Sequence, residues 1–200
     1  MQNIIYRRKA YRRMPGTLIL IGILLGICYY LTAKYPIGAE FMETVYRHVA
    51  RAVISYQDKI LIARLKGAHS FLPGGGVETG ESCEMALQRE LFEELGLKSI
   101  TASRFMGVME DSYLENEKVI HSVSHVFEVN CPSSELENHY PHPQSKEDHL
   151  QFYWLAPTRE NLENHNVLSR SVPELISNFM TEQKPFFFTD MQHLSRRKKV

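Results

Sequence analysis

The sequence predicts an α/β fold, and three observations support this prediction. Several short runs are rich in β-branched and aromatic residues and are separated by turn-forming residues, as strands are. One segment, 82–96, has the periodicity and the terminal residues of an amphipathic helix. The chain has 200 residues and a hydrophobic content of 44%, which is enough for one domain with a sizeable core and extensions.

The first two predicted strands, 48–56 and 59–65, flank the turn pair Gln57-Asp58 and are expected to form a hairpin. Two later segments, 158–164 and 172–181, are predicted to be helices, and the polar, proline-bearing segment 131–149 a long loop. The remaining predicted strands are 99–109, 118–129 and 151–155.

The segment 82–96 is expected to start at Ser82, whose hydroxyl can cap a helix, and to end at Gly96. Leucines at 87, 91 and 95 recur every four residues and form an apolar stripe. Met85 and Phe92 form a second apolar line. We therefore expect this helix to be packed on more than one side.

The same helix gathers negative charge. Glu90, Glu93 and Glu94 stand at i, i+3 and i+4, so their carboxylates share one face. Such carboxylates repel each other unless a cation lies among them, and their oxygens suit a hard divalent ion such as Mg²⁺. Arg89 lies four residues before Glu93 and can orient it.

Three consecutive glycines, Gly74 to Gly76, precede this helix. Glycine permits a sharp turn and a close approach of the backbone, so this loop can bring a main-chain carbonyl to a metal and leave room for phosphate oxygens. An amphipathic helix alone would be interpreted as an ordinary solvated helix. The joint spacing of Gly75, Glu81, Arg89 and Gly96 distinguishes this segment from such a helix and indicates a functional motif.

At these residues the chain resembles the Nudix hydrolase family. The family signature is G, five residues, E, seven residues, then R-E-U-x-E-E-x-G-U, where U is aliphatic. All nine constrained positions are met between Gly75 and Leu97. The resemblance implies an α/β/α sandwich around a mixed β-sheet. It also implies a hydrolase that acts on phosphoric anhydride bonds and cleaves a nucleoside diphosphate linked to another moiety.

The resemblance further implies a cofactor, Mg²⁺ or Mn²⁺, and a role for each matching residue. Either Glu90 or Glu93 would be the base toward the attacking water, and Arg89 would hold Glu93 in place. The implied metal ligands are Glu81, Glu90, Glu93, Glu94 and the carbonyl oxygen of Gly74.

Residues that contact the substrate are harder to assign. Arg51 and Arg64 are phosphate partners or ordinary surface arginines, and Tyr113 is a base-stacking ring or a packing residue. Gly75 and Gly76 are expected to lie against phosphate. The candidates for an additional glutamate from a loop are Glu147, Glu135 and Glu117.

Composition excludes several alternatives. The formal net charge is zero, which argues against a general nucleic-acid binder. The three cysteines show no metal-ligand spacing and no even disulfide set, which fits a reducing compartment. The histidines are interpreted as solvated or structural and not as metal ligands. The expected partner is a small nucleotide-derived substrate.

The ends of the chain are assigned separately from a catalytic domain at 42–181. Residues 1–41 form a basic and apolar leader in which 14–33, an N-terminal apolar helix, is a candidate transmembrane segment. The basic cluster before it predicts that the domain faces outward, where nucleotides are scarce. Two alternatives follow. Either residues 1–41 anchor a cytoplasmic domain, or translation begins at Met42 and the leader is an artefact of the assigned gene start. Residues 182–200 are assigned as a C-terminal tail.

Two other functions remain open on these residues. A non-catalytic nucleotide-sensing module could use the same pocket, although the intact Arg89, Glu90, Glu93 and Glu94 argue for catalysis. A membrane-associated interaction protein would depend on the leader.

Overall fold

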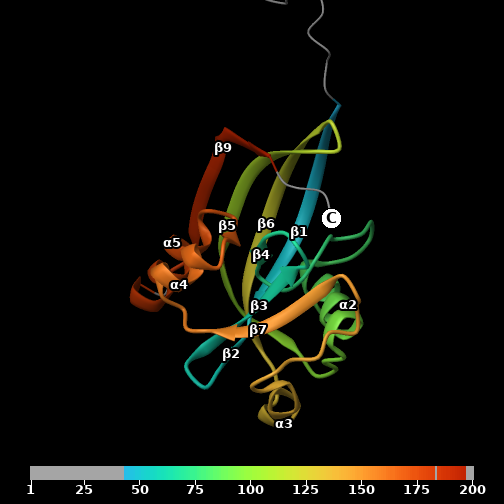
Figure 1. The fold of residues 1–200 in the computed structure, drawn as a ribbon, viewed down its shortest axis with the longest axis vertical. Helices are drawn as coiled ribbons and strands as arrows, with labels where there is room; N and C mark the ends of the chain where they lie inside the picture. Colours follow the sequence, from blue (N-terminus) through green and yellow to red (C-terminus); the bar gives the residue numbers. More distant parts are fainter. Residues whose placement is uncertain (1–42, 183, 197–200) are drawn as a thin grey trace, which may run out of the picture. The chain divides into compact units, whose positions relative to one another are not determined.

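A computed structural model describes residues 43–182 and 184–196. One sheet has the strand order β1-β6-β5-β9, in which β1 and β6 are parallel, β6 and β5 antiparallel, and β5 and β9 parallel (Figure 1). Its strands are β1 (Thr44–Val53), β5 (Thr101–Glu115), β6 (Lys118–Asn130) and β9 (Phe186–Arg196).

The second sheet has the order β2-β3-β4-β8, with β7 paired to the other edge of β3. The hairpin of β2 and β3 turns at Gln57 and Asp58, which both have positive φ. The strands of this sheet are β2 (Ser55–Tyr56), β3 (Lys59–Leu65), β4 (Ser70–Phe71), β7 (Leu150–Leu155) and β8 (Val167–Leu168).

Strand β3 has apolar cores on both of its faces. Leu61 and Ala63 belong to a core with helix α2 (Cys83–Leu95). Ile60 and Ile62 belong to a core with α4 (Arg159–Asn164) and α5 (Val172–Glu182). Side chains alternate across a strand, so a continuous apolar run of this kind requires cover on both sides. The run KILIARL therefore explains why helices flank the sheets.

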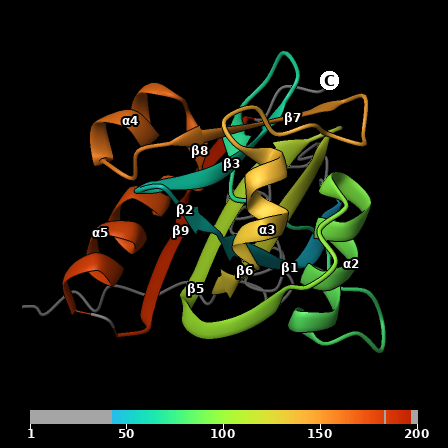
Figure 2. The same cartoon turned by 90° about the horizontal axis from the view of Figure 1, so that it is seen from below.

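Figure 2 shows this layering from below, with α2 on one side of the strands and α4 and α5 on the other. Helix α4 begins after Thr158, whose hydroxyl caps it by accepting from the backbone N–H of Asn161. The described residues also form the short helix α3 (Ser133–Leu136) and the 3-10 turn η1 (Glu137–His139).

Helix α2 confirms its predicted ends. Ser82 accepts a hydrogen bond from the backbone N–H of Met85, and Gly96 adopts the left-handed conformation with φ 80°. The three leucines at 87, 91 and 95 are buried. Met85 and Phe92 are 53% and 47% exposed, so they do not form a second buried line. The ammonium of Lys146 lies 4.7 Å from the centre of the Phe92 ring, and its backbone N–H donates to the carbonyl of Glu94.

Other elements differ from prediction at their ends. The strand predicted at 99–109 continues to Glu115, and part of the predicted loop 131–149 is helical in α3 and η1. Residues 186–196, within the range assigned to the tail, form β9 and pair with β5. The leader 1–41, with its candidate helix 14–33, lies outside the described residues. Within residues 43–182 and 184–196, no helix has the length and apolarity needed to cross a bilayer.

Candidate active site

The glycine loop runs along the edge of β1 that β6 leaves open. The backbone N–H of Ala50 donates to the carbonyl of Gly75 at 3.0 Å, and that of Val77 donates to the carbonyl of His48 at 2.9 Å. These bonds fix the loop between β1 and α2. The φ of Gly74 is +113°, and a side chain there would also meet the carbonyl oxygen of Ala50 at 2.4 Å. Only glycine fits this position.

Gly75 is required for a different reason. An added Cβ at Gly75 would lie 2.3 Å from Cδ of Glu90, so the Glu90 carboxylate occupies the space that a side chain would need. At Gly76 an added Cβ would meet nothing within 4 Å. The loop is therefore in direct contact with the acidic face of α2 at Gly75.

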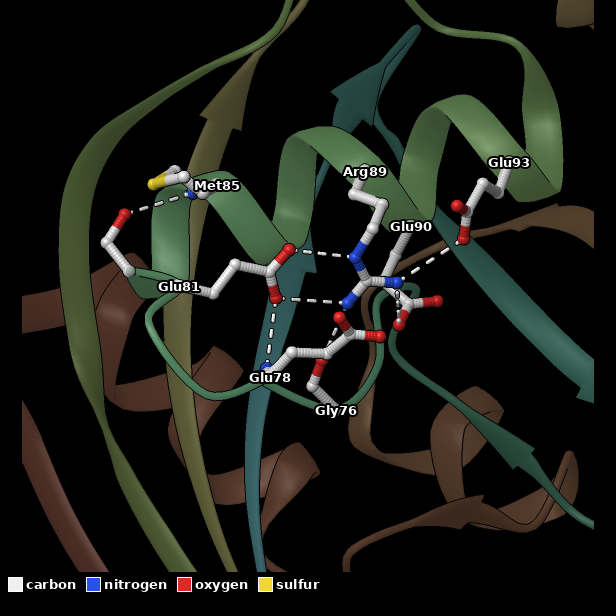
Figure 3. Close-up of polar contacts among 8 residues, drawn as sticks. Gly76, Glu78, Glu81, Met85, Arg89, Glu90 and Glu93 are labelled. Carbon is white, nitrogen blue, oxygen red and sulfur yellow. Dashed lines mark hydrogen bonds and ion pairs between the residues drawn. The ribbon is translucent and has the colours of Figure 1, made fainter.

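Arg89 organises the acidic residues (Figure 3). Its guanidinium binds Glu81 through two hydrogen bonds, from Nε at 2.8 Å and from Nη2 at 3.1 Å. Nη1 donates to Glu90 at 2.8 Å and to Glu93 at 3.3 Å, and Nη2 also donates to the carbonyl of Gly76 at 2.9 Å. The hydrogen bonds between Arg89 and Glu81 are the largest cause of two opposite shifts. They raise the pKa of Arg89 and lower the pKa of Glu81.

Glu94 is the buried member of the carboxylate set, with only 5% of its surface exposed. Burial, followed by the neighbouring charge of Glu90, raises the pKa of Glu94 to about 8. The backbone N–H of Gly74 donates to this carboxylate, while Oε2 has no hydrogen-bond partner among the described residues. A buried acceptor without a partner is costly, and a bound cation would satisfy it.

The three loop candidates have different surroundings. Glu147 lies near enough to Glu94 to raise the pKa of that carboxyl, and it pairs with His149 at 3.2 Å. Glu135 accepts a hydrogen bond from the backbone N–H of Lys98 at 2.7 Å, so it caps the chain after α2. Glu117 lies in the turn between β5 and β6 with a φ of +63°. Of the three, only Glu147 lies near Glu94.

A groove of about 530 Å³ lies along β1 and reaches the glycine loop at Gly76. We call it the β1 groove, and the lining residues used below are Arg47, Arg51, Phe71, Gly76 and Tyr113. Arg51 donates to the carbonyls of Leu72 and Gly74, and its guanidinium lies 4.9 Å from the centre of the Phe71 ring. The other predicted arginine, Arg64, lines a separate cavity together with Glu147 and Tyr153.

Sequence reasoning missed Arg47. This residue donates to the hydroxyl of Tyr113 at 3.1 Å and to Glu115 at 2.6 Å. Because side chains alternate along a strand, Arg47 and Arg51 lie on the same face of β1. That periodicity was the available signal. Tyr113 itself is only 3% exposed.

Comparison with known proteins agrees with this geometry. A model of the NUDIX domain matches residues 46–175. The RNA pyrophosphohydrolase of Pectobacterium carotovorum subsp. carotovorum (strain PC1) is 44% identical over 52 residues, which is 26% of this chain and 29% of that protein. That of Klebsiella pneumoniae (strain 342) is 45% identical over 51 residues, or 25% and 29% of the two chains. The chain therefore aligns with less than a third of the length of these relatives.

Solved structures share the fold. A NUDIX hydrolase from Nitrosomonas europaea superposes with a TM-score of 0.51 at 18% identity, covering 70% of this chain and 93% of that one. The MutT protein from Methanosarcina mazei Go1 gives a TM-score of 0.50 at 18% identity, covering 72% and 99%. Both confirm the predicted α/β fold. With a family model that spans well over half of its residues, and with the signature on α2 and its glycine loop, this chain belongs to the NUDIX family.

Proposed function

We propose that this chain hydrolyses a phosphoric anhydride bond in a nucleoside diphosphate derivative with the help of Mg²⁺ or Mn²⁺. The observation that carries the proposal is the arrangement around Glu94. Oε2 of its buried carboxylate has no hydrogen-bond partner among the described residues. Glu90 and the glycine loop lie next to it, and the absence of a side chain at Gly75 leaves room for the Glu90 carboxylate. This arrangement supports a site built for a cation and for phosphate.

The donor set fits a hard divalent ion, because carboxylate and carbonyl oxygens are the ligands that such ions prefer. Glu90, Glu93 and Glu94 would hold it. The carbonyl of Gly74 would join them once Arg51, which donates to it here, turned to another partner. Both oxygens of Glu81 are engaged by Arg89, so we infer that Glu81 acts mainly by positioning Arg89.

When bound, the ion supplies charge neutralisation of the anhydride and lowers the pKa of a water molecule. The protein must then accept the proton of that water. Glu90 is fixed by Arg89 and faces the glycine loop, whereas Glu93 is half exposed and has one longer contact with Arg89. Either can serve as the general base, which typically contributes about 10²–10⁴-fold in rate.

The test is release of phosphate or mononucleotide by the full chain, measured with Mg²⁺ and again with EDTA in excess. We expect turnover only with the metal, and we expect Glu94→Gln to lower it by about 100-fold because a ligand is lost. Glu160→Gln, at an acidic residue in the first turn of α4, is the matched control and should keep the activity. Turnover that persists in EDTA or in Glu94→Gln would refute the assigned site.

The substrate class rests on the β1 groove. Arg47 and Arg51 line this groove. Glu115 and Tyr113 hold the guanidinium of Arg47, and backbone carbonyls hold that of Arg51, so both would exchange these partners for phosphate. A guanidinium can bind two oxygens of one phosphate. We propose a small nucleotide-derived substrate. The panel should contain nucleotide sugars, dinucleoside polyphosphates, ADP-ribose and nucleoside triphosphates. It should also contain an RNA, because the short match is to proteins named RNA pyrophosphohydrolase.

The alternative, a nucleotide-sensing module, predicts binding without turnover. Calorimetric titration of the same panel distinguishes the two, because a sensor would bind a nucleotide tightly and release no product over hours with Mg²⁺ present.

We further propose that the functional domain begins near Met42. It would include β9, because that strand completes the sheet beside β5. Truncation of residues 1–41 should leave activity intact. N-terminal sequencing and membrane fractionation of the native protein test whether the leader is translated and whether it anchors the chain.

A further inference from the structure

Three potential metal ligands that are distant in sequence meet outside the carboxylate cluster. They are His48 on β1, Cys83 at the start of α2, and His125 on β6. Nε2 of His48 lies 3.1 Å from Nδ1 of His125 and 3.4 Å from Sγ of Cys83. All three ligand atoms lie within 4.8 Å of one another.

The fold brings them together through two fixed relationships. Strands β1 and β6 are parallel and in a register that places Ala50 opposite His125, so the imidazoles of His48 and His125 lie on neighbouring strands. Their ring centres are 4.8 Å apart, at an angle of 69°. Cys83 is the first residue of α2, which packs on β1, and the cap at Ser82 fixes the start of that helix.

We propose that His48 Nε2, Cys83 Sγ and His125 Nδ1 form a binding site for Zn²⁺ or a similar borderline transition-metal ion, distinct from the oxygen site on α2. A thiolate and two imidazoles are ligands that such ions prefer and that Mg²⁺ does not. The site has three protein ligands and leaves the fourth tetrahedral position to water or to a substrate group, since His48 is exposed.

The distances suit tetrahedral coordination. Bond lengths of about 2.0–2.1 Å to nitrogen and 2.3 Å to sulfur place two nitrogens about 3.3 Å apart, and a nitrogen and a sulfur about 3.6 Å apart. The observed pairs at 3.1 Å and 3.4 Å are close to these separations. The third pair, Cys83 with His125, lies within 4.8 Å.

The environment of His125 also favours ligation. Its ring is half-buried and lies 6.2 Å from that of Phe105, centre to centre. Burial, and then the neighbouring His48, lower the pKa of His125. A metal binds the neutral form of an imidazole, and a lowered pKa favours that form.

A metal here would tie the first turn of α2 to β1 and β6. Cys83 and Glu90 are seven residues apart on this helix, or about 10 Å along its axis. The ion would therefore restrain the helix that carries the carboxylates without sharing their ligands. Binding to the folded state alone raises the melting temperature in proportion to the logarithm of metal concentration.

The test uses Co²⁺ as a spectroscopic substitute for Zn²⁺. The full chain, free of any histidine tag and kept reduced with a phosphine, is titrated with Co²⁺ while Mg²⁺ is in large excess. We expect a stoichiometric thiolate-to-cobalt charge-transfer band together with the intense visible bands of tetrahedral cobalt. Oxygen-only coordination by the carboxylates produces neither. Zn²⁺ should displace the cobalt and abolish both signals.

Matched variants assign the ligands. Cys83→Ser should lose the charge-transfer band, whereas Cys28→Ser and Cys131→Ser, at the other cysteines, should keep it. His48→Ala and His125→Ala should each weaken Co²⁺ binding by about tenfold or more, whereas His121→Ala, also on β6, should leave it unchanged. Zn²⁺ should raise the melting temperature of the wild type and not that of Cys83→Ser.

Three results would overturn the proposal. They are the absence of the band in the wild type, its survival in Cys83→Ser, and cobalt affinity unchanged in both histidine variants. The readouts are spectral and thermal, so they are independent of whether the chain hydrolyses any nucleotide.

Discussion

The carboxylate of Glu90 lies where a side chain of residue 75 would have to be, because a Cβ built on Gly75 is 2.3 Å from Cδ of Glu90. The backbone at Gly75 does not have the positive φ seen at Gly74 and Gly96. Its requirement for glycine therefore comes from the carboxylate and not from the turn. This contact fixes the distance between the glycine loop and the acidic face of α2.

Gly75→Ala should displace the Glu90 carboxylate and lower kcat by about 100-fold, because a misplacement of about 1 Å in a catalytic group has effects of this size. Gly76→Ala is the matched control, since a Cβ there meets nothing within 4 Å. Its kcat at saturating substrate should stay within about twofold of the wild type, whereas its KM can rise because Gly76 lines the β1 groove. Steady-state kinetics and melting temperatures of both variants check the prediction. Equal activity in the two would show that Glu90 moves aside without consequence.

Arg89→Lys should lower kcat by about 10–100-fold, because lysine keeps the charge but loses the paired hydrogen bonds to Glu81 and the contacts to Glu90 and Glu93. The control is Arg159→Lys on α4, where the arginine forms only an exposed pair with Glu163 at 3.2 Å. That change should be silent in activity and in stability. Similar losses in both variants would contradict a specific role for Arg89.

Stability of the metal-free protein should fall as the pH rises from about 5 to 8. The folded pKa of Glu94 is about 8, above its ordinary value of 4.5, so the folded state binds the proton more tightly than the unfolded state. The contribution of protonated Glu94 to stability is complete below the pKa of the unfolded chain, 4.5, and it is lost as the pH rises through the pKa of the folded chain, about 8. It amounts to roughly 2–4 kcal/mol.

Urea unfolding in EDTA at a series of pH values measures this slope. Glu94→Gln, which is neutral throughout, should flatten it, and Glu160→Gln should not. A slope of the same size in Glu94→Gln would assign the proton to another group.

The two glutamates Glu147 and Glu135 should separate into a functional and a structural role. Glu147 lies near Glu94, so Glu147→Gln should change activity or metal affinity with little change in melting temperature. Glu135→Gln weakens the charged hydrogen bond to the N–H of Lys98, so it should cost about 1 kcal/mol of stability and leave kcat unchanged. The reverse pattern would show that the roles are exchanged.

Local sequence predicted the framework of the site well. The helix ends at Ser82 and Gly96, the buried leucine stripe and the shared face of the glutamates all follow from helical periodicity and capping, which depend on neighbours within a few residues. The exposure of Met85 and Phe92 was not predictable in this way. Apolar spacing indicates which residues share a line but not whether another element covers it.

The amino-acid sequence by itself determined the family, the acidic helix and its glycine loop, because their spacing is set within one stretch of 23 residues, from 75 to 97. Only the tertiary structure decided that Glu94 is buried with a raised pKa, that Arg51 and not Arg64 lines the β1 groove, and that His48 and His125 meet Cys83. These are contacts between segments that lie tens of residues apart. They depend on strand register and on how helices pack against sheets. The spacing of residues within one segment indicates neither of these.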